Sequence, residues 1–338
     1  MGLDLRQLRY FREIVARGSI TRAAAALRVA QPALSLQVKA MEQALGTRLL
    51  IRGQGGVTPT EAGALLAARA QAILDDLARA EDEVRSLGGD PAGMVRLGLP
   101  GTIGGIVALP LIEAARGRHP RITLTIAEAM SGFVADWLEQ GRVDLGVLYV
   151  PPRAVGVASD PLLEEELVVL APAADTDLPA QMALADLRGR RMVLPGPAHG
   201  LRALVDAALL DQGFAPQIAV EVDSYSSIKS LVAAGYGLSI LPRHALRDDL
   251  ARGRLRAVRI ADPGLWRRVH LACPTRRPMT PAQQAIRDLL RDVVAGLVQS
   301  GAWGPARPVI ANGRITVAEL LDRGHGAVVL ARDKQSSE

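Results

Sequence analysis

Residues 19–58 read SITRAAAALRVAQPALSLQVKAMEQALGTRLLIRGQGGVT, and this stretch decides the fold of the N-terminal part of the chain. Its start predicts a short alanine-rich helix over residues 20–27, because alanine favours helix and lets a second helix approach closely. After a break of three residues, Pro32 suits the first turn of another helix, where its missing N–H costs nothing. Apolar residues at helical spacing then give this second helix one core-facing side: Leu34, Val38, Met41 and Leu45.

The opposite side of the second helix is polar and slightly basic. It carries side chains that hydrogen-bond to base edges and phosphates: Gln31, Ser35, Gln37 and Lys39. A helix-turn-helix protein places such a helix in the major groove. Residues 48–58 predict a hairpin that would form a wing. An ordinary helical hairpin with a solvated face is the alternative, but turn, polar face and wing occur here together and in order.

Composition bounds the class of protein. A chain of 338 residues with 49% hydrophobic residues should form two or three domains with well-buried cores. Residues 1–58 carry nine Arg or Lys against three acids, whereas the whole chain has a net charge of +5, so the basic excess lies in the N-terminal segment. Cys273 is the single cysteine, which excludes a disulfide framework and a cysteine-based metal site.

The N-terminus is polar and charged, so no secretory signal is expected, and the longest apolar run, residues 101–112, is too short to span a bilayer. These features predict a cytoplasmic protein.

A long helix is expected after the wing. Thr58 would be its N-cap, with Pro59 at the first position and Glu61 in the first turn. Residues 59–88 would form this linker helix, whose apolar stripe one helix cannot bury alone. Self-pairing into a dimer would bury it, and packing onto its own domain is the alternative.

Beyond a Gly-rich linker at residues 88–93, short apolar strands alternate with helices. The pattern predicts mainly parallel sheets covered by helices, arranged as two lobes that are joined by crossing segments near residues 149–160 and 263–269. An effector-binding domain would span residues 94–300, with lobe I over about 94–155 and 268–300 and lobe II over about 162–266. Residues 301–308 read as a turn-rich linker. In the extension 301–338, of unknown role, residues 316–322 could form a helix and 327–331 a strand.

Several motifs resemble the LysR-type transcriptional regulators. They are LRQLRYF at 5–11, GSITRAA at 18–24, AQPALS at 30–35, LGTRLL at 45–50 and TPTEAG at 58–63, with looser matches at VRLG, 95–98, and AGYGLSILP, 234–242. The resemblance implies a winged helix-turn-helix head, a dimerising linker helix, a two-lobed effector domain like periplasmic binding proteins, and a homotetramer built as a pair of dimers. The head looks closest to the nitrogen-assimilation-control and cyanate-regulator branch.

The motif match predicts the residues that contact DNA. Gln31, Ser35 and Gln37 would face the major groove, with Pro32 also among the DNA-binding residues. Lys39 and Arg52 would reach phosphates, and Thr21 and Arg22 could touch the DNA backbone. A solvated surface charge is the alternative for each cation. Leu36 follows Ser35 where many relatives carry a basic residue, so a basic contact cannot be carried over to it, and it could instead meet a thymine methyl.

Two strand-to-helix loops are the expected effector site. Pro100, Gly101, Thr102 and Ile103 in lobe I would offer backbone N–H groups and a hydroxyl to an anion. In lobe II the candidates are Pro195, Gly196, His199 and Ser224. His199 could be a pH-sensitive contact or a surface histidine, while Ser224 and Ser227 could be N-caps only. These loops contain no Arg, so a tightly clamped dicarboxylate is not expected, and a small metabolite with an anionic edge is preferred.

The function predicted from sequence is a sequence-specific transcriptional regulator that binds promoter DNA, self-associates and responds to a small-molecule effector. No cofactor, metal site or membrane partner is expected, and no common catalytic motif is present. The alternatives are an architectural DNA-binding protein without effector control, a solute-binding protein and an enzyme on a two-lobed body. The missing export signal and the basic head argue against the solute-binding protein.

Overall fold

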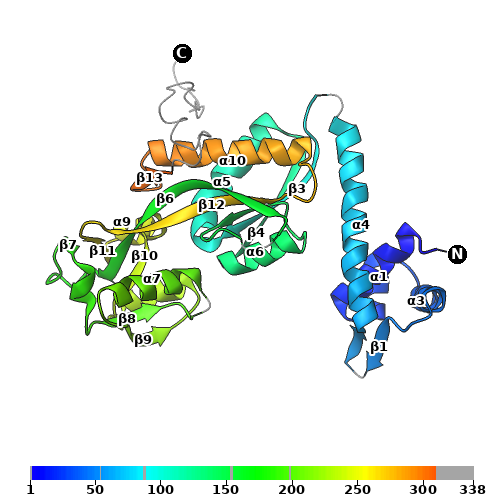
Figure 1. Cartoon of the computed structure of the whole chain (residues 1–338), viewed down its shortest axis with the longest axis horizontal. Coiled ribbons are helices and arrows are strands. Elements are labelled where there is room, and N and C mark those ends of the chain that lie inside the picture. The colour runs from blue at the N-terminus through cyan, green and yellow to red at the C-terminus, as the bar shows by residue number, and fades with distance from the viewer. Residues whose placement is uncertain (1, 54, 87–88, 153–154, 198, 310–338) are drawn as a thin grey trace, which may run out of the picture. The chain divides into compact units, whose positions relative to one another are not determined.

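The computed structural model describes residues 2–53, 55–86, 89–152, 155–197 and 199–309. The chain forms two compact units, Met1–Gly89 and Asp90–Glu338. Each is described by itself, and the elements are labelled in Figure 1. In the described part of the chain, no helix combines the length and apolarity needed to cross a membrane.

The first unit is a three-helix bundle with a hairpin. Its elements are α1 (Leu5–Arg17), α2 (Ile20–Leu27), α3 (Gln31–Leu45), β1 (Leu50–Gly53) and β2 (Gly56–Pro59), with the two strands antiparallel. Phe11, Leu34 and Met41 are fully buried between the helices. Leu45, expected on the same face, is 46% exposed because α3 ends there, past the core. Gln54, in the expected wing loop, lies outside the described residues.

The long helix α4 (Glu61–Arg85) begins later than the sequence predicts. Thr60 is its N-cap, because the Thr60 hydroxyl accepts a hydrogen bond from the Gly63 N–H at 3.0 Å and donates to the Arg48 carbonyl at 2.7 Å. The expected cap, Thr58, and Pro59 belong instead to β2. Ala70 and Leu74 are buried on α4, whose contacts with α1 tie it to the bundle.

The second unit has two lobes, each with its own hydrophobic core. Lobe I contains three parallel strands, β3 (Gly93–Pro100), β4 (Ile122–Ala129) and β5 (Leu145–Leu148), with α5 (Gly101–Arg118), α6 (Ser131–Glu139) and α10 (Pro281–Gln299). Lobe II contains β7 (Gln181–Met182), β8 (Arg191–Leu194), β9 (Gln217–Glu221), β10 (Ser239–Pro242) and β11 (Leu255–Ile260), with the helices α7 (Gly200–Asp211), α8 (Tyr225–Ala233) and α9 (Arg247–Ala251). Two short 3-10 turns, η2 (Leu184–Leu187) and η3 (Arg243–Leu246), complete lobe II.

Two long antiparallel strands connect the lobes, β6 (Val157–Pro172) and β12 (Leu265–Pro274) (Figure 1). They belong to a sheet with the order β4-β3-β5-β12-β6-β11-β7. Because β10, β11 and β12 all pair antiparallel with β6, the expectation of mainly parallel sheets is wrong and the sheet is mixed. The expected crossing at 149–160 includes residues 153 and 154, which lie outside the described residues.

The segment after α10 is part of the fold rather than the linker that the sequence suggests. Trp303 is 1% exposed in the core of lobe I, and β13 (Ala306–Pro308) pairs antiparallel with β6. The fold therefore continues past residue 300. The expected helix at 316–322 and strand at 327–331 lie outside the described residues, as do residues 87 and 88, where the expected linker helix ends and the Gly-rich linker begins.

Candidate nucleic-acid interface and effector site

Capping and turn geometry set the angle between α2 and α3. The Ser19 hydroxyl accepts a hydrogen bond from the Arg22 N–H at 3.3 Å and caps α2. Arg28 ends α2 in the left-handed conformation, with φ of 55°, which turns the chain sharply toward α3. Pro32 then lies in the first turn of α3, as predicted from the sequence.

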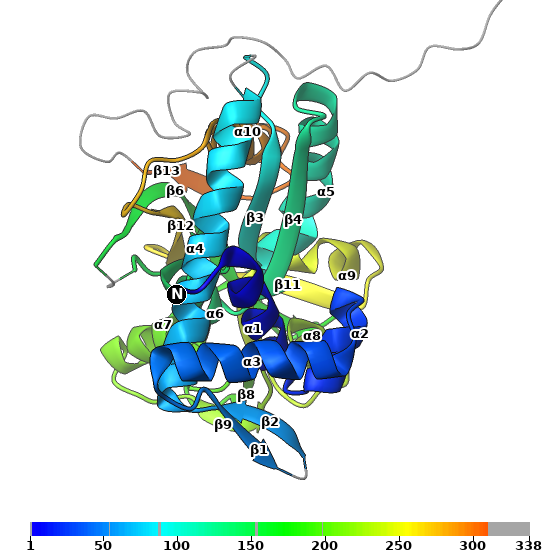
Figure 2. The same cartoon turned by 90° about the vertical axis from the view of Figure 1, so that its right-hand side faces the viewer.

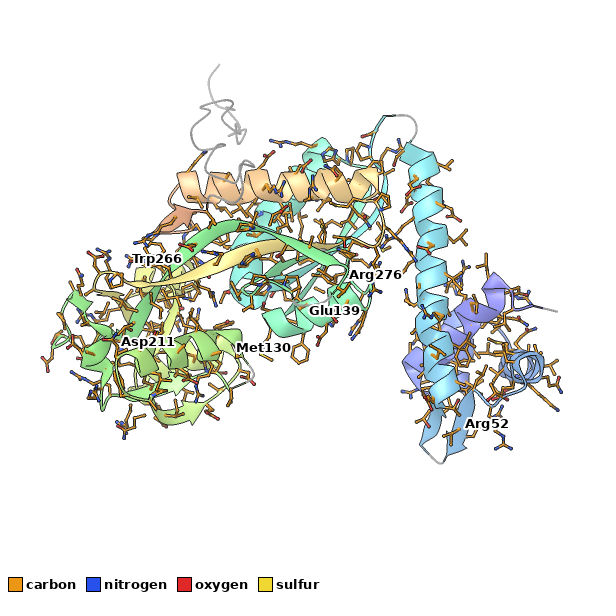
Figure 3. The ribbon with its side chains drawn as sticks, viewed as in Figure 1. Arg52, Met130, Glu139, Asp211, Trp266 and Arg276 are labelled. Carbon is orange, nitrogen blue, oxygen red and sulfur yellow. The ribbon has the colours of Figure 1, made fainter. Side chains whose placement is uncertain are left out.

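Helix α3 and the strands of the wing, β1 and β2, lie next to each other in the first unit (Figure 2). An open groove of about 780 Å³ lies between α3 and the wing. Five of the eight predicted DNA contacts line it: Gln31, Pro32, Ser35, Lys39 and Arg52. Arg52, labelled in Figure 3, extends from β1 into solvent. Within the groove, the Gln31 amide donates a hydrogen bond to the Ser35 hydroxyl at 3.0 Å, so these two side chains present one polar surface.

The other predicted DNA residues lie elsewhere. Gln37 accepts a hydrogen bond from the Gln7 amide at 3.1 Å, which holds it against α1. Thr21 and Arg22 are exposed at the start of α2.

Sequence reasoning missed two groove residues of the wing, Arg48 and Ile51, and the group that holds the wing in place. One carboxylate oxygen of Glu42 accepts hydrogen bonds from the N–H groups of Leu49 and Leu50, at 2.8 and 3.3 Å. Glu42 therefore fixes the first wing strand to α3.

In the second unit, polar side chains meet where the lobes join. Thr102 lies in the first turn of α5, which starts at Gly101 directly after β3, so no loop separates the strand from the helix as the sequence suggests. The Thr102 hydroxyl hydrogen-bonds to the Tyr149 hydroxyl, and its carbonyl accepts a hydrogen bond from Nε2 of His244 at 3.1 Å. Because His244 belongs to lobe II, this contact joins the two lobes.

A buried ion pair lies on the connecting strands at the same junction. Arg267 on β12 faces Glu165 on β6 in register, and Arg267 Nε donates to Glu165 Oε1 at 2.8 Å. The side chains are 3% and 1% exposed. The guanidinium also stacks 3.5 Å from the centre of the Tyr149 ring, and the Trp303 indole N–H donates to the other Glu165 oxygen at 3.2 Å. The junction thus contains one cation and one anion that neutralise each other.

His199 is buried rather than a surface residue. Its Nδ1 accepts a hydrogen bond from the Leu201 N–H at 3.1 Å and caps α7, and its Nε2 lies 3.2 Å from the Tyr225 hydroxyl. Because Nδ1 is an acceptor, the neutral ring carries its proton on Nε2. Burial, helped by the positive charge of Arg267, lowers the pKa of His199.

The hydroxyls at the junction remain neutral. Burial raises the pKa of Tyr149 and of Tyr225 above the ordinary value for tyrosine, although the positive charge of Arg267 opposes this. Burial also lowers the pKa of His244, against the effect of Glu165. The junction therefore offers neutral hydrogen-bonding groups around one internally paired cation.

The remaining predicted effector residues have structural partners. Ser224 caps α8 by accepting from the Ser227 N–H at 3.4 Å, and the Gly196 N–H donates to Asp223 at 2.9 Å. Ile103 is buried in the core of lobe I. Pro100 and Gly101 form the start of α5, and Pro195 accepts a hydrogen bond from Arg202 through its carbonyl at 3.2 Å.

The structure also brings together residues that the sequence did not single out: Tyr149, Glu165, Tyr225, His244, Arg267 and Trp303. An arginine is therefore present at the junction, although the candidate loops contain none. No His, Cys, Asp or Glu cluster suited to a metal ion occurs in the described ranges.

Two family models match the chain. The model described as the LysR substrate binding domain matches residues 88–295, and the model described as the bacterial regulatory helix-turn-helix protein, lysR family, matches residues 5–64. Among relatives, the nitrogen assimilation regulatory protein nac of Klebsiella aerogenes is 33% identical over 295 residues, which cover 87% of this chain and 96% of nac. The regulator CfxR of Cupriavidus necator is 30% identical, and the match covers 91% of this chain and 98% of CfxR.

Solved structures agree in fold. A full-length OxyR variant from Pseudomonas aeruginosa superposes with a TM-score of 0.66 at 27% identity and covers 87% of this chain and 95% of OxyR. Full-length CbnR in complex with its target DNA gives a TM-score of 0.66 at 24% identity, and the match covers 86% of this chain and 100% of CbnR. The resemblance of the head to the nitrogen-assimilation-control branch agrees with the similarity to nac.

Proposed function

The chain belongs to the LysR family of bacterial transcriptional regulators, and from that premise we propose which surfaces of this protein recognise DNA and a small molecule. It is a DNA-binding regulator with an effector-binding domain, and not an enzyme. We propose that it acts in the cytoplasm. We also propose that duplex DNA binds at the α3–wing groove, with α3 facing the bases in the major groove of the DNA.

One observation carries the DNA proposal: the α3–wing groove combines polar hydrogen-bonding side chains with three cations, Lys39, Arg48 and Arg52. Among the described residues that line the groove, Glu42 is the single acid, and it accepts hydrogen bonds from the N–H groups of Leu49 and Leu50. The groove is therefore electropositive and offers both base-reading and phosphate-binding groups.

Arg52→Ala tests the phosphate contact. We expect weaker binding to specific and random duplexes alike, with the slope of log K against log salt reduced by roughly one unit. Fluorescence anisotropy across a salt series measures both quantities. Arg9→Ala is the matched control, since Arg9 is exposed on α1 and does not line the groove. An unchanged slope in Arg52→Ala would remove Arg52 from the interface.

Gln31→Ala tests base reading. A lost base contact should reduce binding to the preferred sequence by about 1–3 kcal/mol and relax the preference at one base pair. The same loss on random DNA would assign Gln31 to the backbone instead. If wild-type protein bound preferred and random duplexes equally, the protein would be an architectural DNA binder, and the regulatory proposal would fail.

We propose that the effector binds at the lobe junction, between the hydroxyl of Thr102 and the ring of His199. The ligand would be a small molecule with a carboxylate or other anionic edge, which would accept hydrogen bonds from the neutral donors of the junction while Arg267 stays paired with Glu165. Its binding would shift an equilibrium between arrangements of the lobes.

A thermal-shift screen of small carboxylates and amino acids tests the site. A binding ligand should raise the Tm of the wild-type protein, and the shift should be lost in Thr102→Val, which keeps the shape but removes the hydroxyl. Ser224→Ala is the control, because Ser224 caps α8. A ligand that shifts Thr102→Val as much as the wild type binds elsewhere.

A further inference from the structure

Two large apolar side chains are exposed inside the α3–wing groove. Leu36 on α3 is 66% exposed, and Ile51 on β1 is 58% exposed. Isolated exposed apolar residues are common on protein surfaces and need no explanation. These two, however, line the same concave surface as Lys39, Arg48 and Arg52, which places them where the groove would meet its ligand.

Leu36 has no role in the core of its own unit. The residues two positions before and after it, Leu34 and Val38, are buried, and a helix turns by about 200° over two residues, so Leu36 points away from the core. Its neighbours on the exposed face of α3 are Pro32, Ser35 and Lys39, which line the same groove. Stability does not explain a leucine at this position, whereas contact with a ligand does.

The chemistry of B-DNA identifies the matching group. The edges of the bases in the major groove carry hydrogen-bond donors and acceptors, and the only apolar group among them is the C5-methyl group of thymine. We propose that Leu36 is a specificity-determining residue that packs on thymine methyl groups, and that Ile51 extends this apolar contact from the wing. The proposal rests on the proposed function, because it requires duplex DNA in the α3–wing groove.

The charges around Leu36 favour duplex DNA over a second protein as the occupant. Lys39, Arg48 and Arg52 surround the apolar pair, and the one acid that lines the groove, Glu42, is hydrogen-bonded to backbone N–H groups. An apolar protein partner would leave these cations desolvated without counter-charges, whereas phosphates on both sides of a major groove supply those charges.

The test removes the methyl group and nothing else. The full chain is first used to select preferred duplexes from a random-sequence pool. Each thymine of a selected duplex is then replaced by deoxyuridine, which pairs identically but lacks the methyl group. For wild-type protein we expect one or two positions at which uracil weakens binding roughly three- to fivefold, the effect of withdrawing one buried methyl group.

The variant Leu36→Ala assigns the effect to the residue. It should bind the thymine duplex roughly three- to fivefold more weakly than the wild type and should no longer distinguish thymine from uracil at those positions. Leu45→Ala is the matched control, since Leu45 is also an exposed leucine of α3 but does not line the groove. Circular dichroism spectra of both variants should match the wild type, because neither side chain is buried.

Each outcome is decisive. If uracil changes the affinity of wild-type protein at no position, Leu36 does not read thymine and the proposal is wrong. If Leu36→Ala retains the full uracil effect, another residue reads the methyl group and the assignment to Leu36 is wrong. If wild-type protein selects no preferred duplex, the proposed function itself fails, a result distinct from the other two.

Discussion

Arg267 and Glu165 place two full charges inside the second unit, where each compensates the other. Removing one partner leaves the other buried charge unpaired, which typically lowers the free energy of unfolding by about 3–5 kcal/mol. We therefore expect Arg267→Met to lower the free energy of unfolding of the second unit by about that amount. Urea unfolding followed by tryptophan fluorescence measures this unit selectively, since all three tryptophans, Trp137, Trp266 and Trp303, belong to it.

The adjacent position on β12 provides the control for Arg267. Arg268 also pairs with a glutamate across the same two strands, Glu164, at 2.8 Å, but its side chain is 53% exposed. Arg268→Met should therefore cost less than about 1 kcal/mol. The double variant Arg267→Met/Glu165→Leu should regain most of the stability, because no charge is left unpaired. Equal effects of the two single arginine variants would contradict the importance of burial.

His244 makes the stability of the second unit depend on pH. Burial lowers the pKa of His244, so between the ordinary value of about 6.5 and the lowered value the unfolded chain binds a proton that the folded chain does not. Stability is complete above this window and falls as the pH drops through it, by at most about 1.4 kcal/mol per pH unit for one group. Urea unfolding at about pH 7.5, 6.5 and 5.5 measures this loss, because these values lie above, at and below the ordinary pKa of histidine.

His244→Gln isolates the contribution of His244. A glutamine amide can still donate to the Thr102 carbonyl but does not titrate, so the loss of stability in acid should be smaller than in the wild type. Some loss should remain, because the pKa values of His199 and His270 are lowered by burial as well. If the pH dependence of this variant equalled that of the wild type, His244 would not be the group that resists protonation.

The polar residues of α3 that line the α3–wing groove could be predicted from sequence because they are repeated on one helix. Gln31, Ser35 and Lys39 recur every fourth position, so local periodicity is enough to place them on one face. The residues of the lobe junction lack this property. Glu165 and Arg267 are 102 positions apart, and only the pairing of β6 with β12 brings them together.

At the scale of elements, the first part of β6 illustrates why some strands escaped prediction. Residues 157–166 contain Asp160, Pro161 and three consecutive glutamates, a composition typical of a loop. The strand forms because β12 supplies Arg267 and Arg268 opposite Glu165 and Glu164. The register of two distant strands therefore stabilises a strand that the local sequence does not favour.

Helix α4 is the element that should determine self-association. One face packs on α1, whereas Leu65, Ile73 and Val84 are exposed within an arc of about 100° on the helix. We expect these residues to pair with a second copy of the chain, so that Leu65→Glu/Ile73→Glu lowers the mass of the assembly. Sedimentation velocity measures the change. Ala78→Glu, exposed on another side of α4, should leave assembly intact; an unchanged mass in the double variant would exclude this face.

At the scale of the whole molecule, regulation requires a coupling free energy between two binding events: DNA binding by the first unit and effector binding by the second unit. Such coupling is reciprocal. DNA must change the affinity of the second unit for the effector by the same factor by which the effector changes DNA affinity, commonly about 1–3 kcal/mol. This gives a test that does not require the effector to be known. The distribution of tryptophans makes it practical, since Met1–Gly89 contains none.

Trp303 is the most informative reporter, because its indole donates to Glu165 within the lobe junction. In a Trp137→Phe/Trp266→Phe variant, Trp303 would be the only tryptophan, and we expect its emission to change as a preferred duplex saturates the protein. Arg52→Ala should move this titration to higher DNA concentration without altering its amplitude, because DNA binding is weakened but the coupling is not. If anisotropy reported full binding while Trp303 emission stayed constant, DNA would not alter the environment of Trp303, and the lobe junction could not be the place where effector binding is linked to DNA binding.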